Sequence, residues 1–238
     1  MASIASAQFL SYLKAVYPTR AGRANPWYIV AAVAFSASNR PQAVPIVFQH
    51  VLEEYNNSTH LERISVARKV RDALFKTGLV CGYSRAINAL LELHKVTPDD
   101  LKDTEPQRDL DAPVQEYVKR GQACFKTLYG DTAPAVQNLL DSIYPDMGWF
   151  SNTIGYGLTY SFAGALTPVE TSYALVAALI TMDTPLQIGW HLDGAMRAGA
   201  SFEEVKAVRR IAMEVAESVG LSWSEGVPEV KNLDESER

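Results

Sequence analysis

Several features that membrane, nucleic-acid-binding and disulfide-stabilised proteins depend on are scarce or missing in this sequence. The 238 residues include two cysteines, Cys81 and Cys124, which are far apart and form no CxxC motif. With 22 basic and 27 acidic residues the net charge is −5, which argues against a nucleic-acid partner. No apolar run approaches the ~20 residues of a membrane span. Zinc-ligand spacings, phosphate-binding glycine loops and the GxSxG motif are also missing, so we expect no metal, cofactor or membrane partner.

Acidic residues are missing from the first 52 positions, which carry Lys14, Arg20, Arg23 and Arg40, whereas the tail after Trp223 is acidic. An N-terminus of this kind is typical of a mitochondrial presequence, but we favour a first helix with a basic exposed face, because segments that must be core follow closely. Two lone thiols suit a reducing compartment. We therefore expect a cytoplasmic protein and keep a mitochondrial location as the alternative.

What is present is helical periodicity along nearly the whole chain, which predicts an all-α fold without a sheet. Helix starts are marked by Thr167-Pro168 with Glu170, and by Ser201 with Glu204. The glycine-rich stretch 148–164 is expected to be irregular. The helices are expected at 3–18, 26–38, 43–56, 61–78, 83–95, 113–128, 132–143, 168–182, 184–199 and 201–219.

Two segments of the chain follow the same order of features, which predicts an internal repeat. In each, a small-residue helix opens with a tyrosine (Tyr28 and Tyr173), a second helix carries a histidine (His50 and His191), and a long charged helix follows. The polar stretch 97–112 separates them. We expect a degenerate first repeat at 1–96, a linker at 97–112 and a second repeat at 113–238, packed as one helical body.

The second repeat resembles the carboxymuconolactone decarboxylase family, which includes the alkylhydroperoxidase D proteins. The resemblance rests on three motifs: Leu-Thr-Pro-Val-Glu at 166–170, His-Leu-Asp-Gly-Ala at 191–195, and Gly-Ala-Ser-Phe-Glu-Glu at 199–204. The segment 82–90 is similar to a further family element, with Ser84 in place of a proline. The resemblance implies an all-α fold, no cofactor, and association of single units into a homo-oligomer. A chain that holds two repeats reaches the same packing with half the copies, so we expect a dimer or trimer.

The departures from the family pattern concern chemistry. The peroxidase branch carries CxxC with a histidine four residues after the second cysteine. Counting back from His191, those positions are Thr184 and Gln187. We therefore expect that the protein is not a thiol peroxidase. The arginine that follows the family glutamate is Thr171 here, so any ion pair made by that arginine is in question.

His191 is the leading candidate for chemistry, because imidazole exchanges protons near neutral pH. A histidine held in the core by packing is the alternative. Glu170 matches the family glutamate, which orients or activates the catalytic group, but its place in a capping box explains it equally well. His50 is expected to be a buried structural residue.

Substrate contacts are expected from Trp190 beside His191, from Tyr156 and Tyr160, and from Arg85. A tyrosine hydroxyl can donate a hydrogen bond to a substrate oxygen, and a guanidinium can pair with a carboxylate. Aromatic packing and an exposed helix start are the respective alternatives. The function that follows is a cofactor-independent lyase, decarboxylase-like, or an isomerase. It acts on a small keto- or lactone-type acid, with His191 as proton donor or acceptor. The alternative is a non-catalytic helical scaffold or small-molecule-binding protein.

Overall fold

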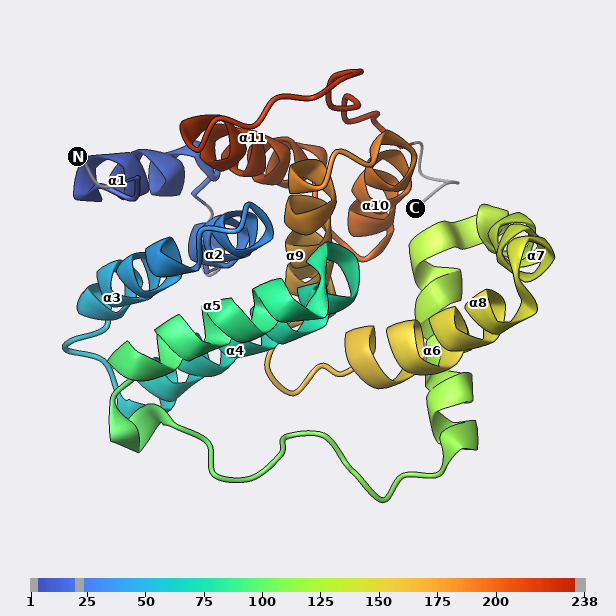
Figure 1. Ribbon diagram of the computed structural model, residues 1–238, viewed down its shortest axis with the longest axis horizontal. Coiled ribbons are helices and arrows are strands. Elements are labelled where there is room, and N and C mark those ends of the chain that lie inside the picture. Colours follow the sequence, from blue (N-terminus) through green and yellow to red (C-terminus); the bar gives the residue numbers. More distant parts are fainter. Residues whose placement is uncertain (1–3, 20–23, 234–238) are drawn as a thin grey trace.

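In the first half of the chain, the described residues form five α-helices and two single 3₁₀ turns (Figure 1). The computed structural model describes residues 4–19 and 24–233, and within these ranges no strand occurs, so the predicted all-α class is confirmed. These elements are α1 (Ala7–Val16), α2 (Trp27–Ala37), η1 (Pro41–Ala43), α3 (Val44–Glu54), α4 (His60–Cys81), α5 (Tyr83–Val96) and η2 (Asp99–Leu101).

The second half continues in helices and contains one unusual element, a π-helix. The stretch 148–164, expected to be irregular, instead holds the end of α8 and this wide helix, in which Ser161 N–H bonds Tyr156 O five residues back at 2.9 Å. The elements are α6 (Val114–Tyr129), η3 (Gly130–Thr132), α7 (Ala133–Ile143), α8 (Pro145–Phe150), the π-helix η4 (Ser151–Tyr160), α9 (Pro168–Thr181), α10 (Pro185–Arg197) and α11 (Phe202–Ser218).

Side-chain caps fix where several helices begin. Capping boxes start α4 at Thr59, α9 at Thr167 and α11 at Ser201, and the last two are those that the sequence predicts. The first helix begins later than expected, because Ser6 caps it by accepting a hydrogen bond from the Phe9 N–H. Some charged positions of the two termini lie outside the described residues. They are Arg20, Arg23, Asp234, Glu235 and Glu237.

Two almost wholly buried helices, α2 and α9, form the centre of the main body and pack against each other (Figure 1). Apart from the polar residues in the first turns of α9, both are apolar almost all round, which is the pattern of a helix with no solvent face. The long amphipathic helices α4 and α11 cover them from both sides. The all-round burial of α2 and α9 is therefore achieved within a single chain.

The packing of the two predicted repeats follows one pattern. In the first, α2 packs against α3 and α4; in the second, α9 packs against α10 and α11. Each central helix also contacts the long helix of the other unit, α2 with α11 and α9 with α4. Both central helices are followed by a non-glycine residue in the left-handed region, Asn39 (φ 56°) and Asp183 (φ 52°). The two segments share one apolar core, as expected for one helical body, while descent from a duplicated unit stays a prediction.

The helices α6, α7, α8 and η4 form a smaller lobe beside the main body, with an aromatic cluster of its own (Figure 1). The lobe contacts the main body through α6, which lies against α10. The predicted linker 97–112 is tied to α4 by two ion-pair clusters: Asp103 pairs with Arg68 at 2.7 Å, and Arg108 pairs with Asp72 at 2.8 Å. These ion pairs hold the linker against the main body. Among the described helices, none has both the length and the apolar character of a bilayer span.

Candidate functional site

A cavity of about 310 Å³ lies where the lobe meets the main body, between α6 and α9. This volume is at the lower end of the range typical of small-molecule sites. Most of the wall is apolar, and no aspartate or glutamate lines it. Its polar or ionisable side chains are Arg120, Cys124, Thr127, Tyr160, Ser161, Thr171 and Ser172.

The α9 wall of the cavity follows from the local sequence. Thr167 caps the helix, Pro168 occupies its first turn, and the backbone is thereby fixed where the helix starts. Pro168, Thr171, Ser172 and Leu175 then recur at helical spacing, so they share one face, and that face lines the cavity. The facing wall comes from α6 and from the residues at and just after the end of η4.

Three tyrosines of the aromatic cluster connect this cavity to α10. Tyr160 lines the cavity, and its ring lies 5.3 Å from that of Tyr156. The hydroxyls of Tyr156 and Tyr129 are hydrogen-bonded at 2.9 Å. Burial raises the pKa of all three phenols, so they stay protonated and able to donate hydrogen bonds at physiological pH. The structure thus brings Tyr156 and Tyr160 together, with Tyr160 in the cavity wall and Tyr156 outside it.

His191 lies on α10 at the far end of this cluster, only 6% exposed. Its ring centroid is 6.2 Å from that of Tyr129, and the neighbouring Trp190 packs edge-on against the same tyrosine at 5.9 Å. The buried Nδ1 atom has no hydrogen-bond partner. Burial lowers the pKa of His191 to about 4, so the imidazole is neutral at pH 7. His191 does not line the cavity itself; the tyrosines lie between them.

The low pKa of His191 predicts a stability that depends on pH. The folded pKa is about 4 and the unfolded value is 6.5, so the unfolded chain binds more protons between these values. The contribution of His191 to the free energy of unfolding should therefore be fully present above pH 6.5. It should be lost as the pH drops towards 4, which lowers the free energy of unfolding by about 3 kcal/mol. Urea unfolding measured across this window should show a smaller fall for His191→Gln. An identical fall in both proteins would contradict the burial of a neutral imidazole.

Glu170 is engaged in two interactions away from the cavity wall. Its carboxylate accepts the Thr167 N–H at 2.9 Å, which completes the capping box, and it pairs with Lys69 of α4 at 2.5 Å. The structure therefore contains the capping interaction of Glu170, together with an ion pair to α4. Next to it, Thr171 accepts a hydrogen bond from Lys76 at 2.8 Å, so α4 supplies cations on this side of α9.

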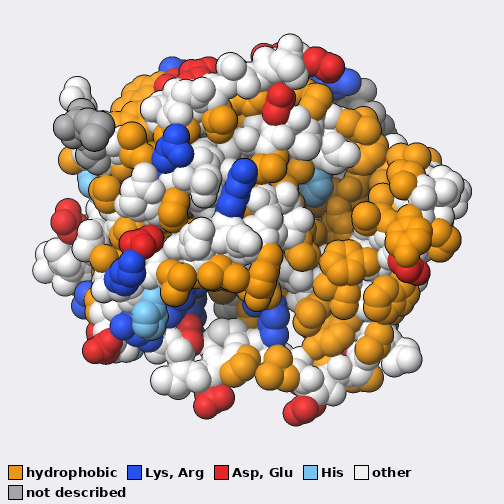
Figure 2. All heavy atoms as spheres, viewed as in Figure 1, with side chains coloured by type: hydrophobic (Ala, Val, Ile, Leu, Met, Phe, Trp, Pro, Cys, Tyr) orange, Lys and Arg blue, Asp and Glu red, His pale blue; other side chains and the backbone are white. Residues whose placement is uncertain are grey.

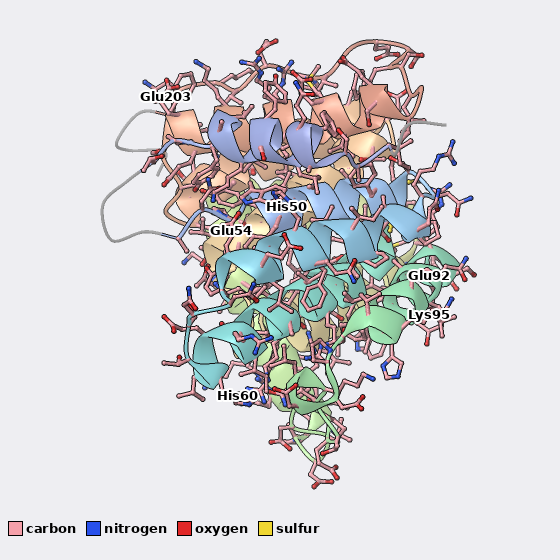
Figure 3. All side chains as sticks on the ribbon, turned by 90° about the vertical axis from the view of Figure 1, so that its left-hand side faces the viewer. His50, Glu54, His60, Glu92, Lys95 and Glu203 are labelled. Atoms are coloured by element: carbon pink, nitrogen blue, oxygen red, sulfur yellow. The ribbon has the colours of Figure 1, made fainter. Side chains whose placement is uncertain are left out.

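The structure does not bring Arg85 to the other candidates. Arg85 lies on α5, where it donates to the Ala37 carbonyl at 2.5 Å and contacts Met182. It lines a separate cavity of about 180 Å³. His50 of α3 is partly buried with its ring against Trp27 at 5.8 Å. Figure 3 shows His50, His60 and Glu203 well apart on different helices, so they form no common site.

Neither thiol has the environment of a reactive cysteine. Cys81, at the end of α4, is buried, and burial raises its pKa. Cys124 lines the cavity, and burial raises its pKa to about 11, which leaves almost no thiolate at pH 7. In the described part of the chain, no group of three or more His, Cys, Asp or Glu side chains is placed to hold a metal ion.

Sequence reasoning missed Lys76, Arg120 and the cavity itself. Thr171 stood out in the sequence because it replaces the family arginine. Its hydrogen-bond partner, Lys76, lies on another helix and could not be found from the motif. Lys76 follows Asp72 at i,i+4 on a charged helix, a pattern typical of a solvent-exposed face. The residue becomes buried because α9 and the residues at and just after the end of η4 cover this part of α4.

A second, larger cavity of about 730 Å³ lies within the lobe, between α6, α7, α8 and η4. Its wall carries charges of both signs, from Lys126, Asp131 and Asp141. None of the predicted site residues lines it. Of the predicted site residues, Tyr160 lines the first cavity, and Tyr156, Trp190 and His191 lie behind it in the aromatic cluster, so we take the first cavity as the candidate site.

Residues 145–223, which include the α9 wall and His191, match the model of the carboxymuconolactone decarboxylase family. The chain belongs to this family, as its motifs suggested. Over most of its length it is also similar to two curated proteins, both named Peroxisomal protein 2. The protein from Saccharomyces cerevisiae is 28% identical, with 95% of this chain and 99% of that protein aligned. The protein from Schizosaccharomyces pombe is 33% identical, with 82% of this chain and 88% of that protein aligned.

Proposed function

We propose that the protein is a cofactor-independent enzyme, a decarboxylase-like lyase or an isomerase, that acts on a small keto- or lactone-type acid in the α6–α9 cavity. One observation carries this proposal. A mostly apolar cavity has Tyr160 in its wall, and aromatic rings lead from Tyr160 through Tyr156 and Tyr129 to the neutral, buried His191. Such a wall removes water from a bound carboxylate, and the row of rings contains one hydrogen-bonded step, between the hydroxyls of Tyr129 and Tyr156, along which a proton can pass.

Each group has a defined part in the proposed reaction. The apolar wall weakens the solvation of the substrate carboxylate, which favours loss of CO₂ from a keto acid. Tyr160, protonated at physiological pH, donates a hydrogen bond to the keto oxygen and stabilises the enolate that forms. The enolate carbon then takes up one proton, which the net reaction draws from solvent. We assign its relay to His191 and the hydrogen-bonded Tyr129–Tyr156 pair, and this relay requires a side-chain movement that brings the Tyr129 hydroxyl to the imidazole. Isomerisation uses the same groups without loss of CO₂.

The second candidate is a non-catalytic protein that binds a small molecule or serves as a helical scaffold. The observation in its favour is that His191 is separated from the cavity by tyrosines and packs edge-on against Tyr129. In this case the family fold is kept and the proton route is not used.

A screen for ligands followed by product analysis tests the proposed function. The full chain is melted in the presence of a library of small metabolites, and the compounds that raise the melting temperature are then incubated with it. We expect small keto or lactone acids among the stabilising compounds, and CO₂ release or an isomeric product from at least one. Stabilising acids that are all recovered unchanged would favour the binding protein instead.

We also propose that the protein is a homo-oligomer, a dimer or trimer. The lobe exposes large apolar side chains, and Figure 2 shows hydrophobic atoms gathered on the side where α7 and α8 lie. An exposed apolar patch of this kind typically marks an interaction surface. The exposed side chains of α7, α8 and the residue between them are Leu139, Ile143, Tyr144, Met147, Trp149 and Phe150. Light scattering on the purified chain measures the mass, and a monomer at micromolar concentration would contradict the proposal.

For the cellular location we propose the peroxisome, because both relatives carry a peroxisomal name. This replaces the cytoplasmic expectation and its mitochondrial alternative, which rested on thiol content and on the charge of the N-terminus. Immunofluorescence of the untagged chain against a peroxisomal marker tests it.

A further inference from the structure

Lys76 is a wholly buried lysine next to the α6–α9 cavity, with 0% of its surface exposed. Its ammonium group donates to the Thr171 hydroxyl at 2.8 Å and to the Phe162 carbonyl at 2.6 Å, and it lies 3.4 Å from the Tyr160 carbonyl. All three of these residues, Thr171, Phe162 and Tyr160, also line the cavity. The cation therefore lies directly behind the cavity wall.

The charge of Lys76 is only partly compensated inside the protein. The nearest carboxylate is Asp72, whose Oδ2 is 3.4 Å away and has no hydrogen-bond partner. The other oxygen of Asp72 accepts a hydrogen bond from Arg108 at 2.8 Å, so two cations share one carboxylate. Burying an uncompensated charge is costly. Consistent with this, burial lowers the pKa of Lys76.

The cavity wall itself is also positive. It contains Arg120 and no acidic side chain. Arg120 forms an i,i+4 ion pair with Glu116, with its Nε 3.6 Å from Oε1, and its side chain is 37% exposed, so the buried Lys76 is the less compensated of the two cations. In a chain of net charge −5, a cavity with cations in and behind its wall and no carboxylate in it selects anions.

The hydroxyl of Thr171 connects the buried cation to the cavity. Because its oxygen already accepts a hydrogen bond from Lys76, its own proton is left to donate to another acceptor. Thr171 lies in the cavity wall, so that acceptor can be a ligand oxygen. A hydroxyl polarised by an ammonium group is a stronger donor, since hydrogen bonds in a chain reinforce one another.

We propose that Thr171 and Lys76 form a carboxylate subsite at this wall of the cavity. Thr171 donates its hydroxyl proton to one carboxylate oxygen of the ligand, and Lys76 acts as a positioning residue that orients this hydroxyl and supplies the compensating charge. The ligand is a small organic acid whose apolar body fills the rest of the cavity. In a decarboxylation the carboxylate held here stays on the substrate, and the group lost as CO₂ is a second one that faces the apolar part of the wall. This inference deepens the proposed function and rests on it for the site, but it requires no particular reaction.

Binding of benzoate and of the uncharged benzamide to the full chain tests the subsite, because the two probes differ mainly in charge. Calorimetric titration of the wild-type protein should give a dissociation constant at least tenfold lower for benzoate. Thr171→Val should remove this preference by weakening benzoate about tenfold while benzamide is unchanged. Thr171→Ser, which keeps the hydroxyl, should stay within about threefold of the wild type.

Two further variants separate this role from a purely structural one. Thr127→Val changes another threonine of the same wall, whose hydroxyl bonds the Ala123 carbonyl, and should leave the benzoate preference intact. Lys76→Met should remove the preference as Thr171→Val does; if this variant fails to fold, Thr171→Val carries the test alone.

Equal binding of benzoate and benzamide by the wild type, including no measurable binding of either, overturns the subsite. A preference that survives Thr171→Val overturns it too. A benzoate preference lost in Thr171→Val supports the subsite even in a protein without measurable turnover, in which case only the proposed reaction is wrong.

Discussion

Replacement of His191 by glutamine should abolish turnover of the acids found in the ligand screen, with a loss of at least about a hundredfold in kcat. Glutamine has a similar size and can form hydrogen bonds, but it does not exchange protons near neutral pH. The wild-type imidazole is buried and neutral at pH 7 and ends the row of tyrosines that leads to the cavity. The variant should keep its helical circular-dichroism spectrum and its oligomeric mass.

His50→Gln is the matched control, because His50 occupies the corresponding helix of the first unit and only packs against Trp27. Turnover should be unchanged in this variant. If activity survives His191→Gln, proton transfer by His191 is wrong. If instead His191→Gln loses its fold or its oligomeric mass, His191 is a packing residue and the enzyme proposal loses its main group.

Gly121→Ala should be the most destabilising addition of a single methyl group, lowering the free energy of unfolding by about 3 kcal/mol. Gly121 lies where α6 crosses the π-helix. A Cβ atom there would lie 1.7 Å from the Asn152 carbonyl oxygen and 3.0 Å from the Gly157 nitrogen. Both are backbone atoms, so the two helices would have to move apart. Because the lobe has only a small aromatic core, it has few other contacts to compensate.

Gly189→Ala on α10 is the control for this prediction. No heavy atom lies within 4 Å of the Cβ position there, and alanine favours a helix over glycine by about 0.5–1 kcal/mol. Urea unfolding should therefore show an unchanged or slightly higher stability for Gly189→Ala. An equal free energy of unfolding for Gly121→Ala and the wild type would contradict the close packing of α6 on the π-helix.

The sequence predicted the helices well because their ends are encoded locally. A capping threonine or serine with a glutamate three residues on, as at Thr167 and Ser201, fixes a helix start whatever packs against it later. The π-helix could not be predicted in this way. Its glycines and aromatic residues follow no 3.6-residue period, and its close packing on α6, through Gly121 and Gly157, is a tertiary contact that the local sequence does not show.

The candidate site was predicted only in part, because its residues meet through tertiary packing. Tyr156, Tyr160, Trp190 and His191 were singled out one by one, and the structure joins them in one aromatic region. Arg85 was chosen for its chemistry alone, and packing places it by Met182. Lys76 went unnoticed, since a lysine on a charged helix gives no sign in the sequence that another part of the chain will bury it.

The central claim is that the α6–α9 cavity binds a small organic acid. A crystal structure of the protein with the most strongly stabilising acid from the screen tests this claim most directly. The account predicts that the acid lies in this cavity, with a carboxylate oxygen within about 3 Å of the Thr171 hydroxyl. An acid found instead in the larger cavity between α6, α7 and α8, or bound with its carboxylate away from Thr171, would contradict it.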